Sequence, residues 1–493
     1  MSSQTTSTVG NENFPEPHEN FKGNDRILFG MIFGVLAFWL FAQTTLNIAP
    51  VMADDLGIET SIMNIAVSIT ALFSGIFIVV IGNLADRWGR VRTVKLGFVL
   101  SIIGSLLVGL TPSGPLAETF LMAGRIFQGL SGAFIMPASL ALVKAYWDGA
   151  ERQRAISLWS MGSWGGSGFA ALFGGIMAAN VGWRWIFFAA VAISIIGLLM
   201  MRGTPESKAS SNSKYKFDIP GVLTFMVMMI GYQVVATQGG NFGWTSPLTI
   251  GILVVSIIAT IIFIQMGKKN PNSFIDFKLF RNMTYTGATI SNFLLNATAG
   301  ILIIAMTLIQ LGGDLTAQQA GLLTLGYAIS IVAFIRVGEV LLRKFGPRKP
   351  MIWGALIVIL SIFLLMPTHF YLDSYQWMVV VAFSLFGVGL AFYATPSTDA
   401  ALVSLPEDQI GSGSGIYKMA SSLGASFGVA ISATVLTAFS ANPESIQWIE
   451  GVISYIGRQD NVAIREAAFF AFGVNLIMAV AALISIMVTI PKK

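Results

Sequence analysis

The sequence is long and poor in charge. It has 493 residues, of which 55% are hydrophobic and 11% are charged, whereas water-soluble domains carry roughly 25% charged residues. With a mean hydropathy of +0.74, this composition excludes a cytoplasmic enzyme and predicts side chains that face lipid or other helices. The absence of cysteine, together with a total of two histidines, argues against disulfides, thiolate chemistry and metal sites built from Cys or His.

The predicted elements are a polar tail followed by a series of apolar helices. Residues 1–25 are polar and contain Pro15 and Pro17, and we expect them to form a disordered cytoplasmic tail. Beyond this tail, apolar stretches long enough to cross about 30 Å of hydrocarbon recur along the chain. We predict an all-α polytopic membrane protein with fourteen transmembrane helices, at 27–50, 62–84, 94–110, 118–142, 155–178, 185–201, 219–237, 247–266, 286–310, 320–341, 350–367, 376–402, 411–439 and 467–490.

The positions of the basic residues support this topology. If the N-terminus is cytoplasmic, 23 of the 29 Lys and Arg residues lie in the two terminal segments or in predicted cytoplasmic loops, as the positive-inside rule requires. An even number of helices near fourteen then places both termini in the cytoplasm. The net charge of +5 therefore reflects topology beside an anionic inner leaflet, and we expect no nucleic-acid partner.

Two pairs of similar segments indicate an internal repeat. RWGRVR at 87–92 resembles RKFGPRK at 343–349, and the prolines of two later helices, Pro137 and Pro396, align at nearly the same offset. Two six-helix bundles of this kind are typical of alternating-access transporters. The predicted parts are a first bundle at 26–202, a cytoplasmic loop at 203–218, two inserted helices at 219–266, an amphipathic cytoplasmic linker at 267–285 and a second bundle at 286–493.

Two motifs resemble those of a known family. GNLADRWGRVR at 82–92 and LMAGRIFQGLSGA at 121–133 resemble signature segments of the major facilitator superfamily, and with fourteen predicted helices the chain resembles its drug:proton antiporter branch. Nearly the whole chain beyond the tail is similar to Nor-type quinolone and multidrug efflux pumps of Gram-positive bacteria. The resemblance implies export of small-molecule drugs from the cytoplasmic membrane of a bacterium, driven by a proton gradient without another cofactor. We expect a monomer.

The first motif has a physical interpretation. Asp86 ends the second predicted helix, where its carboxylate could face the N–H groups at the start of the thirteenth helix and latch the cytoplasmic side shut. Arg87 and Arg90 could pair with acids across this gate, for example Asp148 or Glu151. Alternatively, these arginines only follow the positive-inside rule.

Arg125 lies about 10 Å inside the fourth predicted helix. A guanidinium at this depth requires a partner or water, and Glu118, seven residues earlier on the same face, is a candidate partner. The family resemblance implies that this arginine takes part in proton coupling. A snorkelling arginine with a structural partner is the alternative.

Three further groups of charges fall within predicted helices. Lys418 could contact an anionic or zwitterionic substrate, or could snorkel to the inner headgroups. Arg336 and Glu339 are three residues apart and are expected to form an ion pair. Asp399, near the inner end of the twelfth helix, is a candidate proton carrier, with a helix-end charge as the alternative.

The sequence departs from the resemblance at two places. Residues 41–50 contain no acid in the first helix, and Ala170 and Ala171 stand where the antiporter motif has Gly-Pro. A missing acid disfavours lipophilic dications and favours neutral or zwitterionic substrates. We expect uncharged polar groups and aromatic rings to contact the substrate, and the candidates are Gln43, Asn47, Asn292, Asn296, Trp39, Tyr393 and Tyr417.

Two transport functions remain open from the sequence. Proton-coupled efflux of amphipathic, quinolone-like drugs is favoured, and a specific metabolite symporter or facilitator is the alternative. An intramembrane enzyme is not expected, because the predicted helices contain no cysteine, no histidine and no facing pair of carboxylates.

Overall fold

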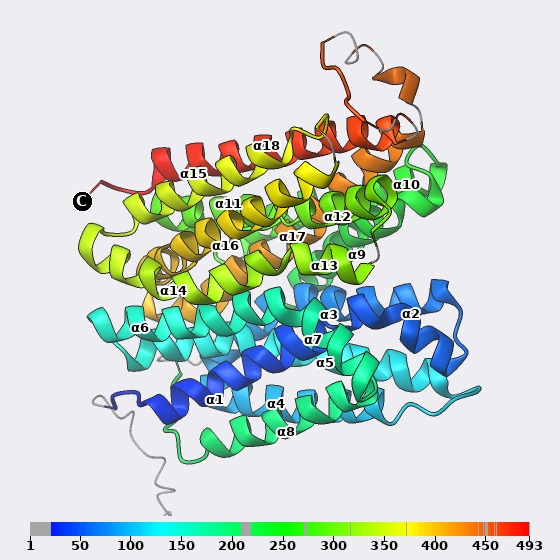
Figure 1. The fold of residues 1–493 in the computed structure, drawn as a ribbon. Helices are drawn as coiled ribbons and strands as arrows, with labels where there is room; N and C mark the ends of the chain where they lie inside the picture. The colour runs from blue at the N-terminus through cyan, green and yellow to red at the C-terminus, as the bar shows by residue number, and fades with distance from the viewer. Residues whose placement is uncertain are drawn as a thin grey trace, which may run out of the picture.

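The fold is taken from a computed structural model. It describes residues 21–492 apart from 209–217, 271–272, 274, 316, 371, 442, 447, 449–451, 458 and 460. Within these residues every regular element is a helix and there is no strand. Figure 1 shows the helices running roughly side by side, with the blue-to-cyan first half in the lower part of the view and the yellow-to-red helices of the second half above it.

The first half contains eight α-helices and two π-helical segments. Apolar residues on nearly every face allow these helices to pack on one another and to face lipid. They are α1 (Asp25–Leu36), η1 (Ala37–Ala42), α2 (Thr45–Leu56), α3 (Thr60–Trp88), α4 (Arg90–Gly109), α5 (Ala117–Tyr146), α6 (Gly149–Ser160), η2 (Met161–Gly165), α7 (Gly166–Asn180) and α8 (Arg184–Met200).

Two helices and a short linker join the halves. The helices pack on each other, and the first of them also contacts α3 and α17. They are α9 (Ile219–Phe242) and α10 (Pro247–Lys269), and η3 (Phe277–Arg281) lies within the linker. Ile275 and Leu279 of the linker are buried.

The second half has the same all-helical character. Its helices contact the first half mainly through α17 against α3 and α5, and through α14 and α16 against α6. The elements are α11 (Met283–Ala297), α12 (Gly300–Thr307), η4 (Leu308–Gly312), α13 (Ala317–Leu323), α14 (Leu325–Phe345), α15 (Arg348–Leu365), α16 (Leu372–Val403), η5 (Glu407–Gln409), α17 (Ile410–Ala441), η6 (Pro443–Ser445) and α18 (Val462–Thr489).

Eleven helices in the described part of the chain are long and apolar enough to cross a membrane. The count is twelve if α7 and α8, which meet at a bend of 118°, are taken as one span. Each of the fourteen predicted stretches nevertheless coincides with helix. The protein is therefore an all-helical membrane protein with about eleven to twelve spans by this measure.

The first predicted span, 27–50, is interrupted in the structure. α1 passes into the π-helical η1, and Gln43 and Thr44 then form a turn before α2 begins. Thr44 is buried and donates its hydroxyl to the carbonyl of Ala170 at 3.1 Å. A polar contact of this kind satisfies backbone and side-chain groups at a helix irregularity inside a membrane protein.

The last residues of the predicted tail contact the first half. Residues 1–20 lie outside the described part, but the Phe21 ring packs edge-on against Tyr146 at 5.0 Å between centroids. Gly23 donates its N–H to the Tyr146 carbonyl at 2.9 Å, and the Asn24 side chain caps α1.

Small residues let α3 and α17 cross closely where the halves meet. A Cβ on Gly82 would lie 2.4 Å from the carbonyl oxygen of Gly411, and one on Gly411 would lie 2.3 Å from that of Gly82. Glycine at both positions therefore allows backbone contact between the halves. This crossing lies beside Asp86.

Candidate transport and gating sites

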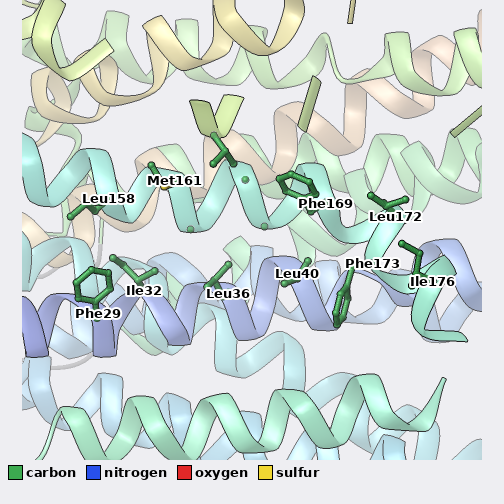
Figure 2. Close-up of a pocket in the computed structure, with 14 residues that line it drawn as sticks. Phe29, Ile32, Leu36, Leu40, Leu158, Met161, Phe169, Leu172, Phe173 and Ile176 are labelled. Carbon is green, nitrogen blue, oxygen red and sulfur yellow. The ribbon is translucent and has the colours of Figure 1, made fainter. Parts of the chain in front are cut away.

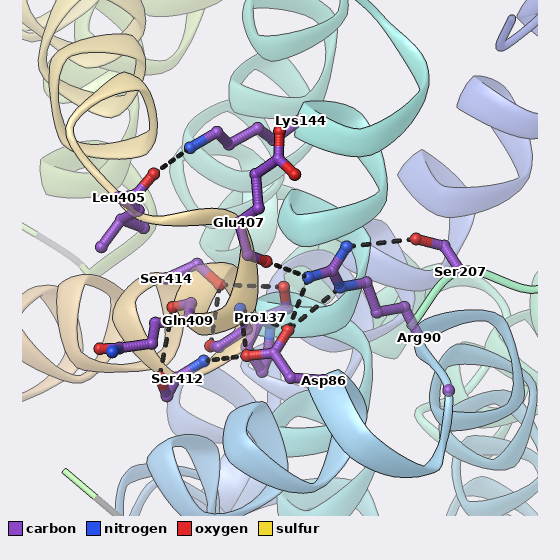
Figure 3. A network of polar contacts seen from close by, with 12 residues as sticks. Asp86, Arg90, Pro137, Lys144, Ser207, Leu405, Glu407, Gln409, Ser412 and Ser414 are labelled. Atoms are coloured by element: carbon purple, nitrogen blue, oxygen red, sulfur yellow. Dashed lines mark hydrogen bonds and ion pairs between the residues drawn. The ribbon is translucent and has the colours of Figure 1, made fainter. Parts of the chain in front are cut away.

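The Asp86 carboxylate binds the N-terminus of α17. It accepts hydrogen bonds from the backbone N–H of Gly411 at 2.8 and 2.9 Å and from that of Ser412 at 3.1 Å. Asp86 is 3% exposed, so the negative charge lies against the positive end of the helix dipole with little solvent screening. The expected contact between the second predicted helix and the start of the thirteenth is present (Figure 3).

Arg90 extends this contact across the two halves. Its guanidinium pairs with Asp86 at 2.8 Å and donates to the Glu407 carbonyl and the Ser207 hydroxyl, both at 3.1 Å. The neighbouring N-terminus of α4 is held in a similar way, because the Glu206 carboxylate accepts from Val91 N–H at 2.8 Å. Two acids thus bind two helix N-termini on the predicted cytoplasmic side.

Three more contacts join the halves at this end. The Lys144 ammonium donates to the Leu405 carbonyl (Figure 3), and Arg152 of α6 pairs with Asp399 of α16 at 3.2 Å. Arg343 of α14 donates to the carbonyl of Ala150 at 3.1 Å. We call the contacts of Asp86, Arg90, Lys144, Arg152 and Arg343 across the two halves the latch.

Among the described residues, Arg90 takes a different acid from those expected from the sequence. Arg90 pairs with Asp86, and Arg87 donates to Asn83 at 3.1 Å. The predicted partner Asp148 instead contacts Arg152 at 4.0 Å. Arg90 and Asp86 are four residues apart across the α3–α4 turn. The Arg90 guanidinium therefore pairs with this nearby acid and not with an acid of a different loop.

Arg125 is fully buried and bound by neutral groups. Its side chain donates to the carbonyls of Ala42 at 2.7 Å and Ala66 at 3.0 Å, and to the side-chain oxygen of Gln128 at 2.7 Å. Thr45 and Val67 accept further bonds. Ala42 ends η1, so Arg125 binds the interrupted first helix to α3 and α5. Several acceptors together offset the desolvation of the guanidinium.

The predicted pairing of Arg125 with Glu118 is wrong for this state. Glu118 is exposed near the start of α5, and among the described residues no carboxylate lies within ion-pair distance of Arg125. Seven residues of helix separate the two Cα atoms by about 10 Å. Gln128, three residues after Arg125 on the same face, takes the place that Glu118 was expected to fill.

Lys418 lies between the halves, about two helical turns along α17 from the Asp86 contact. It is 4% exposed, and its ammonium sits 4.3 Å from the ring centroid of Trp159 on α6. The Trp159 indole N–H donates to Ser139 at 2.9 Å, which fixes the ring. In the described part of the chain no acid forms an ion pair with Lys418. Its charge is therefore held by cation–π attraction.

Four of the expected substrate-contacting residues form a polar cluster in the second half. The Tyr393 hydroxyl bonds those of Ser291 at 2.7 Å and Ser397 at 2.8 Å, and Ser397 bonds the Tyr417 hydroxyl at 2.8 Å. The Asn292 amide donates to the Tyr417 carbonyl at 2.8 Å, and the Asn296 amide donates to Asn292. The cluster holds α11, α16 and α17 together, so in this state these side chains form hydrogen bonds within the protein.

The candidates of the first helix are separate from this cluster. Trp39 is half-buried, and among the described residues its indole N–H has no hydrogen-bond partner. Gln43 is half-buried at the turn that follows η1. The side chain of Asn47 lies outside the described part.

Arg336 and Glu339 form the expected ion pair on α14. Glu339 also pairs with Arg343, so one buried carboxylate serves two partly exposed arginines. In the described residues there is no group of three or more His, Cys, Asp or Glu that could hold a metal ion.

Comparison with known proteins identifies the family. The model of the Major Facilitator Superfamily matches residues 28–429 and 288–492. The quinolone resistance protein NorB of Staphylococcus aureus (strain MRSA252) is 46% identical over 417 residues, which are 85% of this chain and 89% of the relative. NorB of strain COL is 43% identical over 475 residues, 96% of this chain and 98% of the relative.

The chain belongs to the Major Facilitator Superfamily. A solved structure shares the fold of the superfamily: the proton:xylose symporter XylE bound to 6-bromo-6-deoxy-D-glucose matches with a TM-score of 0.64 at 16% identity, over 95% of this chain and 96% of that chain. Membership makes the protein a membrane transporter and not an enzyme, and confirms the resemblance drawn from the two motifs.

Sequence reasoning missed several residues of this superfamily member. Gln128, Lys144 and Arg152 contact a functional candidate or the opposite half, and Glu206 accepts from the N-terminus of α4 beside the latch. The spacing of three from Arg125 is a signal that could have pointed to Gln128. The other three act across loops or between halves, and no local spacing indicates their partners.

Proposed function

We propose that this transporter exports amphipathic, quinolone-like drugs, neutral or zwitterionic, across the cytoplasmic membrane of a bacterium in exchange for protons. The observation that carries the proposal is 43–46% identity with NorB proteins over most of the chain. Proton coupling follows from the family branch that the motifs resemble.

The proposed topology has fourteen crossings with both termini in the cytoplasm. The eleven spans that pass by length and hydropathy leave three predicted stretches, which coincide with α6–η2–α7, α8 and α9. The bend of 118° between α7 and α8 largely reverses the direction of the chain, which suits two antiparallel crossings. The two bundles at 26–202 and 286–493, with the inserted pair α9–α10 between them, are part of this proposal.

The latch provides a mechanism for alternating access. With Asp86 bound to the α17 N-terminus and Arg152 bound to Asp399, the two halves are joined on the cytoplasmic side, which suits a state closed toward the cytoplasm. Protonation of Asp86 or Asp399 would remove the charge that holds each contact. Proton uptake at these acids can therefore bias the equilibrium between the two states.

Arg125 would couple the first helix to this movement. It holds the Ala42 carbonyl at the break between η1 and α2, so a change in its hydrogen bonds would move the segment that carries Trp39 and Gln43. We propose Glu118 as an acid that reaches Arg125 in another state and Arg336 with Glu339 as a supporting pair.

Lys418 would select the substrate. It is a buried cation without an acidic partner among the described residues, so the carboxylate of a zwitterionic drug could gain a charge-assisted hydrogen bond there, while the Trp159 ring would face the aromatic part of the drug. A dication would meet repulsion at the same place.

Transport into inverted membrane vesicles tests this function. We expect a zwitterionic fluoroquinolone to accumulate when a proton gradient is applied, more strongly than the dye ethidium, and an uncoupler to abolish the accumulation. If neither compound accumulates, proton-coupled drug efflux is wrong, and saturable transport of a single metabolite becomes the function to test.

A further inference from the structure

A long apolar groove lies on the side of the molecule. Its volume is about 530 Å³, and it is lined by α1 with η1, by the continuous segment α6–η2–α7 and by Val332 of α14. Figure 2 shows Ile32, Leu36 and Leu40 along one wall and Phe169 and Leu172 along the other. Every lining residue is apolar, so the groove suits a hydrocarbon and offers no side-chain hydrogen bond to a polar ligand.

The groove has the length of one bilayer leaflet. Phe29 of α1 and Leu40 of η1 are the first and last lining residues of this wall, and eleven residues of helix extend about 17 Å. Half of the hydrocarbon core of a bilayer is about 15 Å thick. Phe29 is 40% exposed and Ile176, at the other end, is 52% exposed. The groove is therefore open to its surroundings.

At one end of the groove, each of its three walls carries a charged residue. Each of these residues lies one helical turn from a lining residue. On the first two walls, Asp25 precedes the lining residue Phe29 by four positions, and Arg154 precedes Leu158 by four. Residues four apart share a helix face. The Arg154 guanidinium binds both carboxylate oxygens of Asp25, at 2.6 and 3.0 Å, so the two walls are tied together at this mouth.

The third wall adds a second arginine. Arg336 follows the lining residue Val332 by four positions on α14 and pairs with Glu339. The side chains of Arg154 and Arg336 are 38% and 43% exposed, and a guanidinium has five N–H donors. Both arginines therefore keep donors for a further anion, at the end of the groove that carries the basic loops.

We propose that this groove binds a phospholipid of the inner leaflet, with one acyl chain in the groove and the phosphate on Arg154 and Arg336. The hydrocarbon wall, its leaflet length and the two arginines at its mouth all match this ligand. α1 and α6 belong to the first half and α14 to the second, so the lipid bridges the halves while the latch is closed. The site is independent of which substrate the transporter carries.

Where α9 packs on α3 and α17, the space between the helices is small. There α9 lies over the contact of α3 and α17, and Gln233 of α9 donates to Ser426 at 2.8 Å. The cavity lined by these helices measures about 20 Å³, room for about one water molecule. An acyl chain therefore fits the groove beside α1 but not the space between α3, α9 and α17.

Photolabelling of the purified full-length protein in lipid nanodiscs tests the site. The probe is phosphatidylglycerol with a diazirine on one acyl chain, and adducts are mapped to peptides by mass spectrometry. We expect adducts on 29–40 and 158–176. Leu158→Trp fills part of the groove and should reduce the number of adducts about tenfold. This is the loss of affinity expected when two methylenes of the acyl chain lose their contact with the protein. Leu253→Trp, on a 37% exposed position of α10, is the matched control and should leave them unchanged.

A second pair of variants tests the phosphate contact without filling the groove. Arg154→Gln and Asp25→Asn both break the same ion pair, but only the first removes the donor. We expect Arg154→Gln to lower labelling and Asp25→Asn to keep or raise it. Equal labelling in Leu158→Trp and Leu253→Trp would overturn the proposal. So would displacement of the label by excess fluoroquinolone without an effect of Arg154→Gln, because the groove would then belong to the drug.

Discussion

At the scale of single residues, Asp86 is the part of the latch that binds the N-terminus of α17. One buried carboxylate accepts from two backbone N–H groups and from Arg90. In Asp86→Asn the amide NH₂ would face the N–H donors of the α17 N-terminus, and Arg90 would lose the negative charge that it pairs with. Removing one partner of a buried pair costs about 3–5 kcal/mol, so we expect the latch to open.

Thiol labelling measures this opening, because the chain has no cysteine. A single Ser160→Cys, at a site 1% exposed, should react with a maleimide about tenfold faster or more in Asp86→Asn, since tenfold corresponds to about 1.4 kcal/mol. Glu151→Gln, at an exposed acid of the same side, is the control. Equal rates in both variants would contradict a gating role for Asp86.

Lys418 gives a prediction about substrate choice. Lys418→Met keeps the apolar stem of the side chain and removes the ammonium that lies over Trp159. We expect quinolone transport to fall about tenfold, the scale of one charge-assisted hydrogen bond, and ethidium transport to stay or rise because a repulsive charge is gone. Parallel vesicle assays of both compounds measure the ratio. A uniform loss of both activities would count against selection by this lysine.

The sequence allowed some of these residues to be placed and not others. The contact of Asp86 with α17 and the pair Arg336–Glu339 were predictable, because one lies in a motif and the other at a spacing of three on one helix. The partners of Arg125 were not, since backbone carbonyls such as that of Ala42 leave no signature in a sequence.

At the scale of elements, the crossing of α3 and α17 depends on paired glycines. In Gly411→Ala the new Cβ would lie 2.3 Å from the Gly82 carbonyl oxygen and 2.6 Å from an Asp86 oxygen, so the helices must move apart. Overpacking of this kind costs about 1–3 kcal/mol, and we expect a lower melting temperature and faster labelling of Ser160→Cys.

Gly251→Ala is the matched control for this crossing. Gly251 also lies within a transmembrane helix, but nothing lies within 4 Å of the position that a methyl group would take there. The control should melt at the same temperature or higher, because alanine favours helix over glycine by up to about 1 kcal/mol. If both variants melted alike, close packing of α3 on α17 would not matter for stability.

The positions of the helices were largely predictable, but their irregularities were not. Hydropathy located helix at every predicted stretch because crossing a bilayer demands long apolar runs. The turn at Gln43 and Thr44 is held by Arg125 and Ala170, which are distant in sequence. Such a break depends on tertiary contacts, and a hydropathy pattern carries no record of them.

At the scale of the whole molecule, the proposed topology can be tested at α9 and α10. Fourteen crossings place the exposed Thr245 outside the cell and the exposed Lys208 inside. In intact cells we expect a membrane-impermeant maleimide to label Thr245→Cys and not Lys208→Cys, and to label both after the cells are opened. Protection of Thr245→Cys in intact cells would show that the inserted pair does not cross the membrane.

The ion pair between Arg152 and Asp399 links the two halves directly. Arg152 belongs to α6 in the first half and Asp399 to α16 in the second, and both are largely buried. If they hold the closed state together, Arg152→Ala and Asp399→Ala should each speed the labelling of Ser160→Cys, and the double variant should be little faster than either alone. Contacting residues couple by about 0.5–3 kcal/mol. Strictly additive effects would mean that the pair does not contribute to closure and that closure depends on Asp86 and the α17 N-terminus. The reason is that a contact that does not couple the halves cannot transmit protonation of Asp399 to the opposite side of the transporter.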